Sequence, residues 1–353
     1  LLDRISGIDS LAKLTAAFGS SNVDGSNSPF AASVDVDRKN PDRYLVGLGV
    51  GGLGLPDKDY YLNPDPRFVA IRAAYVEHIQ RMLGFAGVPV AEATPRAEAI
   101  LALETALAKN HWDRAQRRDR DKTYNVVTFA QLQQQYPKFD WAGLFKAQGM
   151  KQPDRVNITT PSSFGPVIDV VNATPINVWK DYLAFNAVRN NAPLLSKEID
   201  EAVFAFNGTV LGGQTAQREP WKRAVALIAD TDGLGDAVGR IYVAKHFKPE
   251  SKAAMDELVE NLRKALRMNI EHVSWMSAAT KAEAYHKLET FRPKIGYTSK
   301  WRNYSTVQVT PGNLLANARA MRRLSTSRSP TPSRSSSPRA TGVRQRRSRS
   351  SGA

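Results

Sequence analysis

The sequence predicts a mainly α-helical lobe with a few short β-strands, including one hairpin, followed by a disordered C-terminal tail. Three observations support this fold class. Apolar residues recur every three or four positions through long stretches, as they do on one face of an α-helix. Apolar and polar residues alternate, as in a half-buried strand, mainly around residues 30–46. Residues 324–353 lack the apolar side chains that a core requires.

The overall composition is that of a soluble globular protein. Of the 353 residues, 42% are hydrophobic and 24% are charged, and the length suffices for one large domain or two with a sizeable core. The absence of cysteine excludes disulfides, thiolate metal sites and cysteine nucleophiles. No run of about 18 apolar residues indicates a membrane segment, and no signal peptide opens the chain. Because the first residue is leucine, we expect the natural N-terminus to be missing.

The first elements are predicted to be a short helix and a β-hairpin. Residues 10–19 form an amphipathic helix with Gly19 as its stop. Apolar residues alternate through the first strand, residues 30–36, and return in the second, residues 44–46. Asn40-Pro41-Asp42 supplies the turn between them. The apolar face of the helix comprises Leu11, Leu14 and Phe18.

Two longer helices follow. Apolar residues at helical spacing predict the first over residues 66–84. Its one histidine, His78, has no nearby ligand partner and is interpreted as structural rather than metal-binding. Thr94-Pro95 supplies an N-cap and a first-turn proline for the second helix. Three apolar residues of the second helix point inward, namely Ile100, Leu103 and Leu107.

A strongly basic segment at residues 114–122 has the positive charge that phosphate binding requires. Asp119 and Asp121 interrupt that charge, however. Alternating signs favour local ion pairs on a solvated face over nucleic-acid binding.

The remaining body is predicted to be helical, with one extended segment. Short helices at residues 128–136 and 141–147 precede an extended stretch at 152–160, and further helices begin at Pro175 and Ser196. Two helices with strong periodicity follow, over residues 249–273 and 277–291. The apolar stripe of the first comprises Met255, Leu258, Leu262, Leu266 and Ile270. The residues expected inside the second are Ala284, Leu288 and Phe291.

The glycine-rich stretch at residues 46–62, VGLGVGGLGLPDKDYYL, admits two interpretations. Gly47, Gly49 and Gly52 match the G-x-G-x-x-G pattern of a dinucleotide-binding turn. That turn needs a helix directly after it, and Pro56 and further glycine oppose one here. The sequence therefore favours a flexible glycine-rich loop closed by a Pro-Asp turn. The residues expected to anchor this loop are Tyr60, Tyr61 and Leu62.

No complete catalytic or metal-binding motif occurs in the sequence. A zinc peptidase needs two histidines one helical turn apart, a glutamate beside the first, and a third ligand. The five histidines, His78, His111, His246, His272 and His286, are never four residues apart. Glu283-x-x-His286 has the spacing of a carboxylate-bridged metal half-site, but without a second such pair an exposed helix face is favoured. We therefore assign no catalytic, cofactor-binding or metal-binding residue.

Several segments nevertheless resemble one family. GGLGLPDKDYYL, at residues 51–62, is similar to a signature of the neprilysin/endothelin-converting-enzyme family of zinc metallo-endopeptidases. Residues 103–119 resemble the family's ETALA, HW and RRD run, and residues 121–125 resemble its DKTYN. Further similar segments follow in the family's order at residues 179–183, 221–223, 237–243, 275–281 and 293–297. Because animal members are rich in disulfides, the absence of cysteine favours the bacterial oligopeptidase branch.

The resemblance implies the N-terminal portion of a zinc enzyme that hydrolyses peptides. In the family, this helical portion helps to enclose the active-site chamber and limits substrates to peptides, while zinc-activated water and a glutamate base cleave on the amino side of hydrophobic residues. The zinc ligands lie in the family's C-terminal part, and this chain loses the family pattern near Arg323, before them. We therefore expect no bound zinc and no activity from this chain alone. The resemblance also implies a periplasmic or secreted location.

Residues 324–353 differ sharply from the body. They contain ten serines and seven arginines but no lysine, acidic or aromatic residue, which predicts disorder. Their seven arginines supply 7 of the net charge of +15, leaving +8 for the body. The abrupt change at one point favours a shift of reading frame over a selected tail. We divide the chain into an N-terminally incomplete peptidase-family domain, residues 1–323, and this tail, residues 324–353.

An alternative function belongs to a different class. A Ser/Arg-rich tail can bind RNA through phosphate neutralisation, so the chain could be a non-catalytic helical interaction protein. The family resemblance and the interrupted charge of residues 114–122 favour the peptidase interpretation, with peptides rather than nucleic acid as partners.

Overall fold

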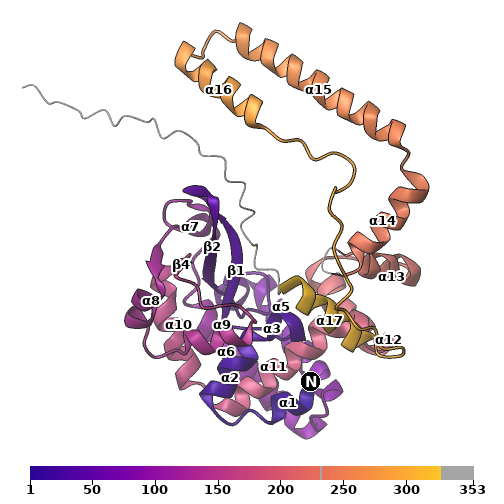
Figure 1. Cartoon of the computed structure of the whole chain (residues 1–353). Helices are drawn as coiled ribbons and strands as arrows, with labels where there is room; N and C mark the ends of the chain where they lie inside the picture. Colours follow the sequence, from indigo (N-terminus) through magenta and orange to yellow (C-terminus); the bar gives the residue numbers. More distant parts are fainter. Residues whose placement is uncertain (231–232, 327–353) are drawn as a thin grey trace, which may run out of the picture.

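The computed structural model describes residues 1–230 and 233–326. Helices hold 61% of the chain and strands 8%, so the predicted mainly helical class is confirmed. Figure 1 shows a body built from the N-terminal helices and a small sheet, with a helical region extending away from it. The shorter helices of the body are α1 (Leu2–Ser6), α2 (Leu11–Gly19), α3 (Ser21–Asp24), α4 (Asp59–Leu62), α7 (Arg114–Arg118), α8 (Phe129–Gln135), α9 (Trp141–Ala147) and α12 (Lys197–Phe204).

The sheet has four strands in the order β1-β2-β4-β3. Strands β1 (Phe30–Asp37) and β2 (Asn40–Val50) form the predicted antiparallel hairpin, and β2 then pairs in parallel with β4 (Arg155–Ile158). β3 (Val126–Thr128), which was not predicted, pairs antiparallel with β4. One face of the sheet carries the buried side chains Phe30, Leu48 and Val156 into the core. The other face is open.

The turn of the hairpin differs from the prediction. Asp37 pairs directly with Asn40 and Val36 pairs with Tyr44, so the turn is at residues 38–39 and residues 41–43 form a bulge. A bulge accommodates Pro41 because its residues need not donate to the ladder. The Asp37 carboxylate fixes the turn by accepting hydrogen bonds from the backbone N–H of Lys39 and from Arg43 Nε, at 3.0 and 2.8 Å.

One hydrophobic core fills the body. The predicted helix α5 (Pro66–Phe85) packs against α6 (Val90–Ala108), and α11 (Ile176–Asn191) packs against both. The largest fully buried side chains include Trp141, Trp179, Tyr75 and Tyr182. Phe30 from the sheet meets Trp141 edge to face, with the ring centroids 5.0 Å apart. The body therefore has a core of its own.

Three details of the body correct the sequence analysis. Helix α6 begins at Val90 and contains Pro95, whereas Thr94 was predicted as its N-cap. The proline is tolerated because near the helix start it removes a single backbone hydrogen bond. Helix α10 (Pro161–Ala173) was not predicted, although its buried residues Phe164, Val167, Ile168 and Val171 have helical spacing. Leu11, expected on an apolar face, is exposed, because only part of α2 meets the core.

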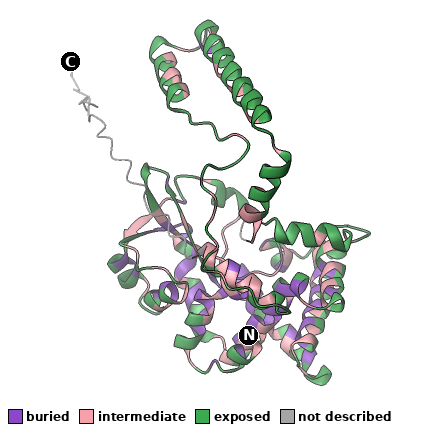
Figure 2. Cartoon of the chain, turned by 45° about the vertical axis from the view of Figure 1, so that its right-hand side comes forward, coloured by how far each residue is buried: buried purple, intermediate pink, exposed green. Residues whose placement is uncertain are grey.

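The extended region comprises four helices and a returning segment. The four helices are α13 (Pro220–Ile228), α14 (Gly235–His246), α15 (Pro249–His272) and α16 (Ala278–Thr290). They follow the 3-10 turn η1 (Ala192–Leu194) and the π-helical segment η2 (Ala205–Leu211). The predicted helices at 249–273 and 277–291 are confirmed, and the Ser277 hydroxyl caps α16 by accepting from the backbone N–H of Thr280. Ala284 and Leu288 are partly buried, but Phe291 is 57% exposed, contrary to the prediction. Figure 2 shows that α15 is almost wholly exposed and that α16 is mostly exposed, with some partly buried residues.

The chain then returns to the body through α17 (Leu314–Thr326). Arg319 of α17 forms an ion pair with Asp24 of α3 at 2.6 Å, and Arg322 Nη1 donates to Asn191 Oδ1 of α11 at 2.9 Å. The helix continues three residues beyond the predicted division at Arg323. The rest of the Ser/Arg-rich tail lies outside the described residues, so its predicted disorder stays a prediction.

Candidate functional site

The glycine-rich stretch is divided between a strand and an ordered loop. Gly47 and Gly49 lie within β2, so the prediction of one continuous flexible loop is wrong for this part. The loop proper occupies residues 51–58, and the four-residue helix α4 follows it. Gly52 has a φ of +90°, which favours glycine. No helix opens directly after Gly52, as predicted, so the dinucleotide interpretation lacks its helix N-terminus.

A buried glutamate organises this loop. Tyr61 Oη accepts hydrogen bonds from the backbone N–H groups of Gly54 and Leu55 at 3.0 and 2.8 Å, and donates to Glu104 Oε2 at 2.7 Å. Tyr75 Oη donates to the same carboxylate oxygen at 2.9 Å. Tyr61 thus anchors the loop, as predicted, through a glutamate whose part the sequence analysis missed. The signal was available, because Glu104 lies four residues after Ile100 on the buried stripe of α6.

Helix α11 holds the loop from its other side. Tyr182 Oη donates to the carbonyl oxygen of Gly52 at 2.8 Å, and Arg189 Nη1 donates to that of Gly54 at 3.0 Å. Loops rarely lie in a core, because their backbone polar groups need partners. Here side chains from α5, α6 and α11 converge on the loop and fasten it against the core.

Burial sets the protonation of this cluster. Desolvation raises the pKa of Glu104 above its ordinary value, although the hydroxyl groups of Tyr61 and Tyr75 and the charge of Arg189 oppose the shift. Desolvation together with the nearby Glu104 carboxylate raises the pKa of Tyr61 and of Tyr75 well above their usual range. Both tyrosines therefore remain hydrogen-bond donors at neutral pH. The cluster fastens the loop and shows no nucleophile paired with a base.

Replacing Glu104 with glutamine should change how stability depends on pH. Because folding raises the pKa of Glu104, the folded state binds its proton more tightly, and the free energy of unfolding falls as pH rises from the unfolded pKa of about 4.3 through the folded pKa. Glutamine cannot titrate, so this loss should be absent in Glu104→Gln. Urea unfolding of both proteins between pH 4 and 8 measures the difference.

The difference between the two curves isolates Glu104. His78 is also buried, and desolvation lowers its pKa to about 3, which contributes stability that rises with pH up to the unfolded pKa of about 6.5. That opposite contribution is present in both proteins and cancels in the comparison. Parallel curves for the wild type and Glu104→Gln would contradict a raised pKa of Glu104 in the fold.

The motif segments that carry the family resemblance meet at the same loop. Asp57, which is 4% exposed, accepts hydrogen bonds from Arg114 Nε at 2.8 Å and from Arg117 Nη2 at 2.9 Å. His111 Nε2 lies 3.0 Å from the carbonyl oxygen of Gly51. The prediction of local ion pairs in residues 114–122 holds for Lys122 with Asp119, at 3.6 Å. It is wrong for Arg114 and Arg117, because a nearly buried carboxylate attracts them more strongly than solvated neighbours do.

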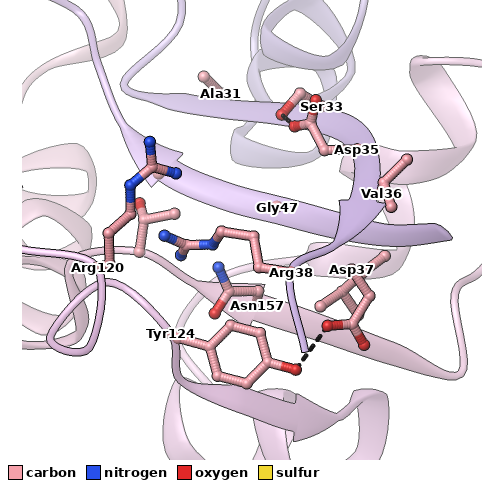
Figure 3. A pocket seen from close by; sticks show the side chains of 13 residues that line it. Ala31, Ser33, Asp35, Val36, Asp37, Arg38, Gly47, Arg120, Tyr124 and Asn157 are labelled. Carbon is pink, nitrogen blue, oxygen red and sulfur yellow. Dashed lines mark hydrogen bonds between the residues drawn. The ribbon is translucent and has the colours of Figure 1, made fainter. Parts of the chain in front are cut away.

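The open face of the sheet carries a pocket of about 680 Å³. Figure 3 shows Arg38 and Arg120 reaching over Gly47 and Asn157, beside Tyr124. Arg38 Nη2 donates to the carbonyl oxygen of Thr123 at 3.0 Å. Tyr124 Oη donates to Asp37 at 2.7 Å, and this hydrogen bond is the main cause that lowers the pKa of Asp37 to about 2. Among the described residues, the lining includes the carboxylates of Asp35 and Asp37 but no histidine.

The histidines are dispersed. His78 stacks on Phe206 in the core, with the ring centroids 4.8 Å apart, and His272 Nδ1 lies 2.7 Å from the carbonyl oxygen of Met268. Glu283 and His286 lie on the exposed surface of α16. Within residues 1–230 and 233–326, no group of three histidine, aspartate or glutamate side chains could hold a metal ion. The donors present in this part of the chain do not fit a catalytic zinc ion.

The family comparison decides the assignment. A family model described as Peptidase family M13 matches residues 1–298, which includes the loop, its glutamate and the arginine pair. This chain belongs to peptidase family M13. Members of the family are zinc metallopeptidases that act on peptides. The recognised resemblance to neprilysin and endothelin-converting enzymes is thereby confirmed.

Relatives and solved structures agree with this assignment. Mouse endothelin-converting enzyme-like 1 is 30% identical over 274 residues, which cover 76% of this chain and 35% of the mouse protein. Neprilysin-2 of Drosophila melanogaster is 29% identical over 281 residues. The open state of the Mycobacterium tuberculosis zinc metalloprotease Zmp1 is 35% identical, with a TM-score of 0.82 over 93% of this chain and 50% of that one. The chain thus spans about a third of its curated relatives and half of Zmp1.

The match is to the N-terminal portion of the family's proteins. The resemblance read from the sequence and the family model agree over residues 1–298. No helix in the described part of this M13 chain is both long and apolar enough to cross a bilayer.

Proposed function

We propose that this chain is the substrate-enclosing N-terminal portion of an M13 zinc endopeptidase and that it neither binds zinc stoichiometrically nor cleaves peptides by itself. The observation that carries the proposal is the match to the M13 family over residues 1–298 in a sequence that contains no H-E-x-x-H. In the complete enzyme, the ordered loop and its buried cluster would stiffen one wall of the chamber, while zinc held by another portion would activate the water.

Metal analysis and a peptidase assay test this proposal. Protein purified in the presence of zinc should contain well under one zinc ion per chain after desalting. It should also leave a quenched-fluorescent peptide with internal hydrophobic residues uncut. The intact M. tuberculosis Zmp1 serves as the positive control. One zinc per chain together with chelator-sensitive cleavage would refute the proposal.

We also propose the division into a peptidase-family portion, residues 1–323, and a tail, residues 324–353, that is out of frame. The abrupt change in composition after Arg323 supports it. The coding DNA should be resequenced through codon 323 and translated in all three forward frames. An H-E-x-x-H downstream in a shifted frame is the expected result. An uninterrupted Ser/Arg frame without such a motif would contradict the division and make the tail a subject for RNA-binding assays.

A further inference from the structure

The pocket on the open face of the sheet has a floor of small residues at its centre. Two cross-strand pairs of β1 and β2 form this floor, namely Ala31 with Gly49 and Ser33 with Gly47. The volume of about 680 Å³ lies within the range of about 300–1,000 Å³ that is usual for ligand sites. A ligand in this pocket can therefore come close to the backbone of two neighbouring strands.

The packing of the sheet does not require glycine at position 47. A Cβ atom there would meet the Ser33 hydroxyl at an ordinary 3.5 Å, and the φ angle lies outside the left-handed region. At Gly49, by contrast, a Cβ atom would lie only 3.0 Å from Thr159 Oγ1. Glycine inside a strand costs stability and often marks a place where a ligand or another backbone approaches closely. The surface above Gly47 is therefore a candidate binding site.

Two arginines give this floor a positive charge. Arg38 and Arg120 reach over it beside Tyr124 (Figure 3). Arg38 Nη2 donates to the carbonyl and hydroxyl oxygen atoms of Thr123 at 3.0 and 3.3 Å, and both of these acceptors are neutral. None of the nearby ion pairs of the described residues includes either arginine. Both guanidinium charges thus remain available to an anionic group.

The carboxylates of the pocket compensate only part of this charge. Asp37 is already paired with Arg43 Nε at 2.8 Å and accepts from Tyr124 Oη. Asp35 is exposed and accepts a hydrogen bond from the Ser33 hydroxyl at 2.9 Å. The pocket therefore offers two cations and one carboxylate that can accept further hydrogen bonds.

We propose that the open face of the sheet binds an acidic peptide in extended form. A carboxylate of the peptide pairs with the guanidinium groups of Arg38 and Arg120, and Asp35 accepts from the peptide's backbone N–H groups. The small floor lets the peptide backbone approach the strands. Inorganic phosphate fits less well, because it fills little of the pocket and its charge faces Asp35. The inference rests on the proposed function for one point, that the ligand is a peptide.

Fluorescence anisotropy with the full chain tests this proposal. The probe is a fluorescein-labelled peptide of alternating serine and glutamate, whose carboxylates lie on one side when the peptide is extended. It should bind, and rising salt should weaken the binding because salt screens exposed charges. The same peptide with glutamine in place of glutamate should bind at least about tenfold more weakly, because it lacks the carboxylates.

Three variants locate the binding. Gly47→Val fills the floor with a side chain that suits a strand and should abolish binding at the pocket. Arg120→Gln removes one guanidinium group and should weaken binding about tenfold. Arg118→Gln makes the same change of charge two residues earlier and outside the pocket, so it should bind like the wild type. Melting temperatures should match the wild type for the two arginine variants, because both side chains are exposed. These two variants decide the question even if Gly47→Val fails to fold.

The arginines of residues 324–353 also attract acidic peptides, so only binding that a pocket variant reduces is assigned to the pocket. Absence of binding, equal weakening by the two arginine variants, full binding by folded Gly47→Val, or displacement of the peptide by equimolar inorganic phosphate or oligouridylate would overturn the inference. The proposed function would survive each of these results if the chain holds no zinc and cuts no peptide. Zinc and peptide cleavage in this chain alone would contradict the proposed function without affecting the peptide binding.

Discussion

Replacing Gly54 with alanine should lower the free energy of unfolding by about 3 kcal/mol. A Cβ atom at this position would lie 1.8 Å from Tyr75 Oη and 2.8 Å from Arg189 Nη1. Tyr75 cannot retreat, because its ring is fully buried and its hydroxyl is held by Glu104. The methyl group would therefore displace the cluster that fastens the loop. Urea unfolding followed by tryptophan fluorescence measures the loss.

Gly47→Ala is the matched control within the same glycine-rich stretch. A Cβ at Gly47 would meet the Ser33 hydroxyl at an ordinary 3.5 Å, and its φ lies outside the left-handed region. This variant should stay within about 0.5 kcal/mol of the wild type. Equal destabilisation by the two substitutions would show that the stretch tolerates no side chain anywhere and that the Tyr75 contact is not the cause.

Replacing Asp24 with asparagine should detach α17 and cost about 2–3 kcal/mol. The Asp24 carboxylate is almost wholly buried and accepts from Arg4, from the Ser20 hydroxyl and from Arg319, at 2.6, 2.7 and 2.6 Å. Asparagine removes the negative charge that both guanidinium groups face. Hydrogen exchange of the backbone N–H groups in α17 should accelerate at least about tenfold, since one lost ion pair of about 1.4 kcal/mol already gives that factor.

The same carboxylate gives a pH dependence of opposite sign to that of Glu104. Burial alone would raise the pKa of Asp24, but the Ser20 hydroxyl and the charges of Arg4 and Arg319 outweigh it and lower the pKa. Its contribution to stability is therefore present above the unfolded pKa of about 3.9 and is lost as pH falls through the folded value. Asp9→Asn, which breaks an exposed pair with Lys13, should leave the protection of α17 the same as in the wild type at each pH. Unchanged exchange of α17 in Asp24→Asn would refute the anchoring role.

Local signals in the sequence were sufficient for most elements of the fold. The alternation in residues 30–46 and the helical spacing in residues 66–84 reflect backbone periods that hold wherever the segment lies. The turn of the hairpin was misplaced because Pro41 was taken as a turn residue. A bulge accepts proline as well as a turn does. The turn forms at residues 38–39 because the Asp37 carboxylate accepts a hydrogen bond from Arg43 across it.

The candidate site depends on pairs of residues far apart in the chain, which a single sequence does not show. Asp57 meets Arg114 and Arg117 nearly sixty positions later, and Glu104 joins Tyr61 from another helix. A glutamate on a buried stripe and an aspartate beside a proline were visible, but their partners were not. The same limit applies to α15. Its periodicity predicts the helix, but a single sequence does not show whether other residues of this chain bury the apolar side chains on one face of that helix.

Because α17 returns to the body, residues 213–313 form an insertion whose two ends are both attached to the hydrophobic core of the body. The chain leaves beside α5 through η2 and contacts α3 again through α17, and between these points it adds almost nothing to the buried core. Because this region contributes little to the core, we expect it to open locally more readily than the body. We therefore expect a protease to cut residues 213–313 before it cuts the body.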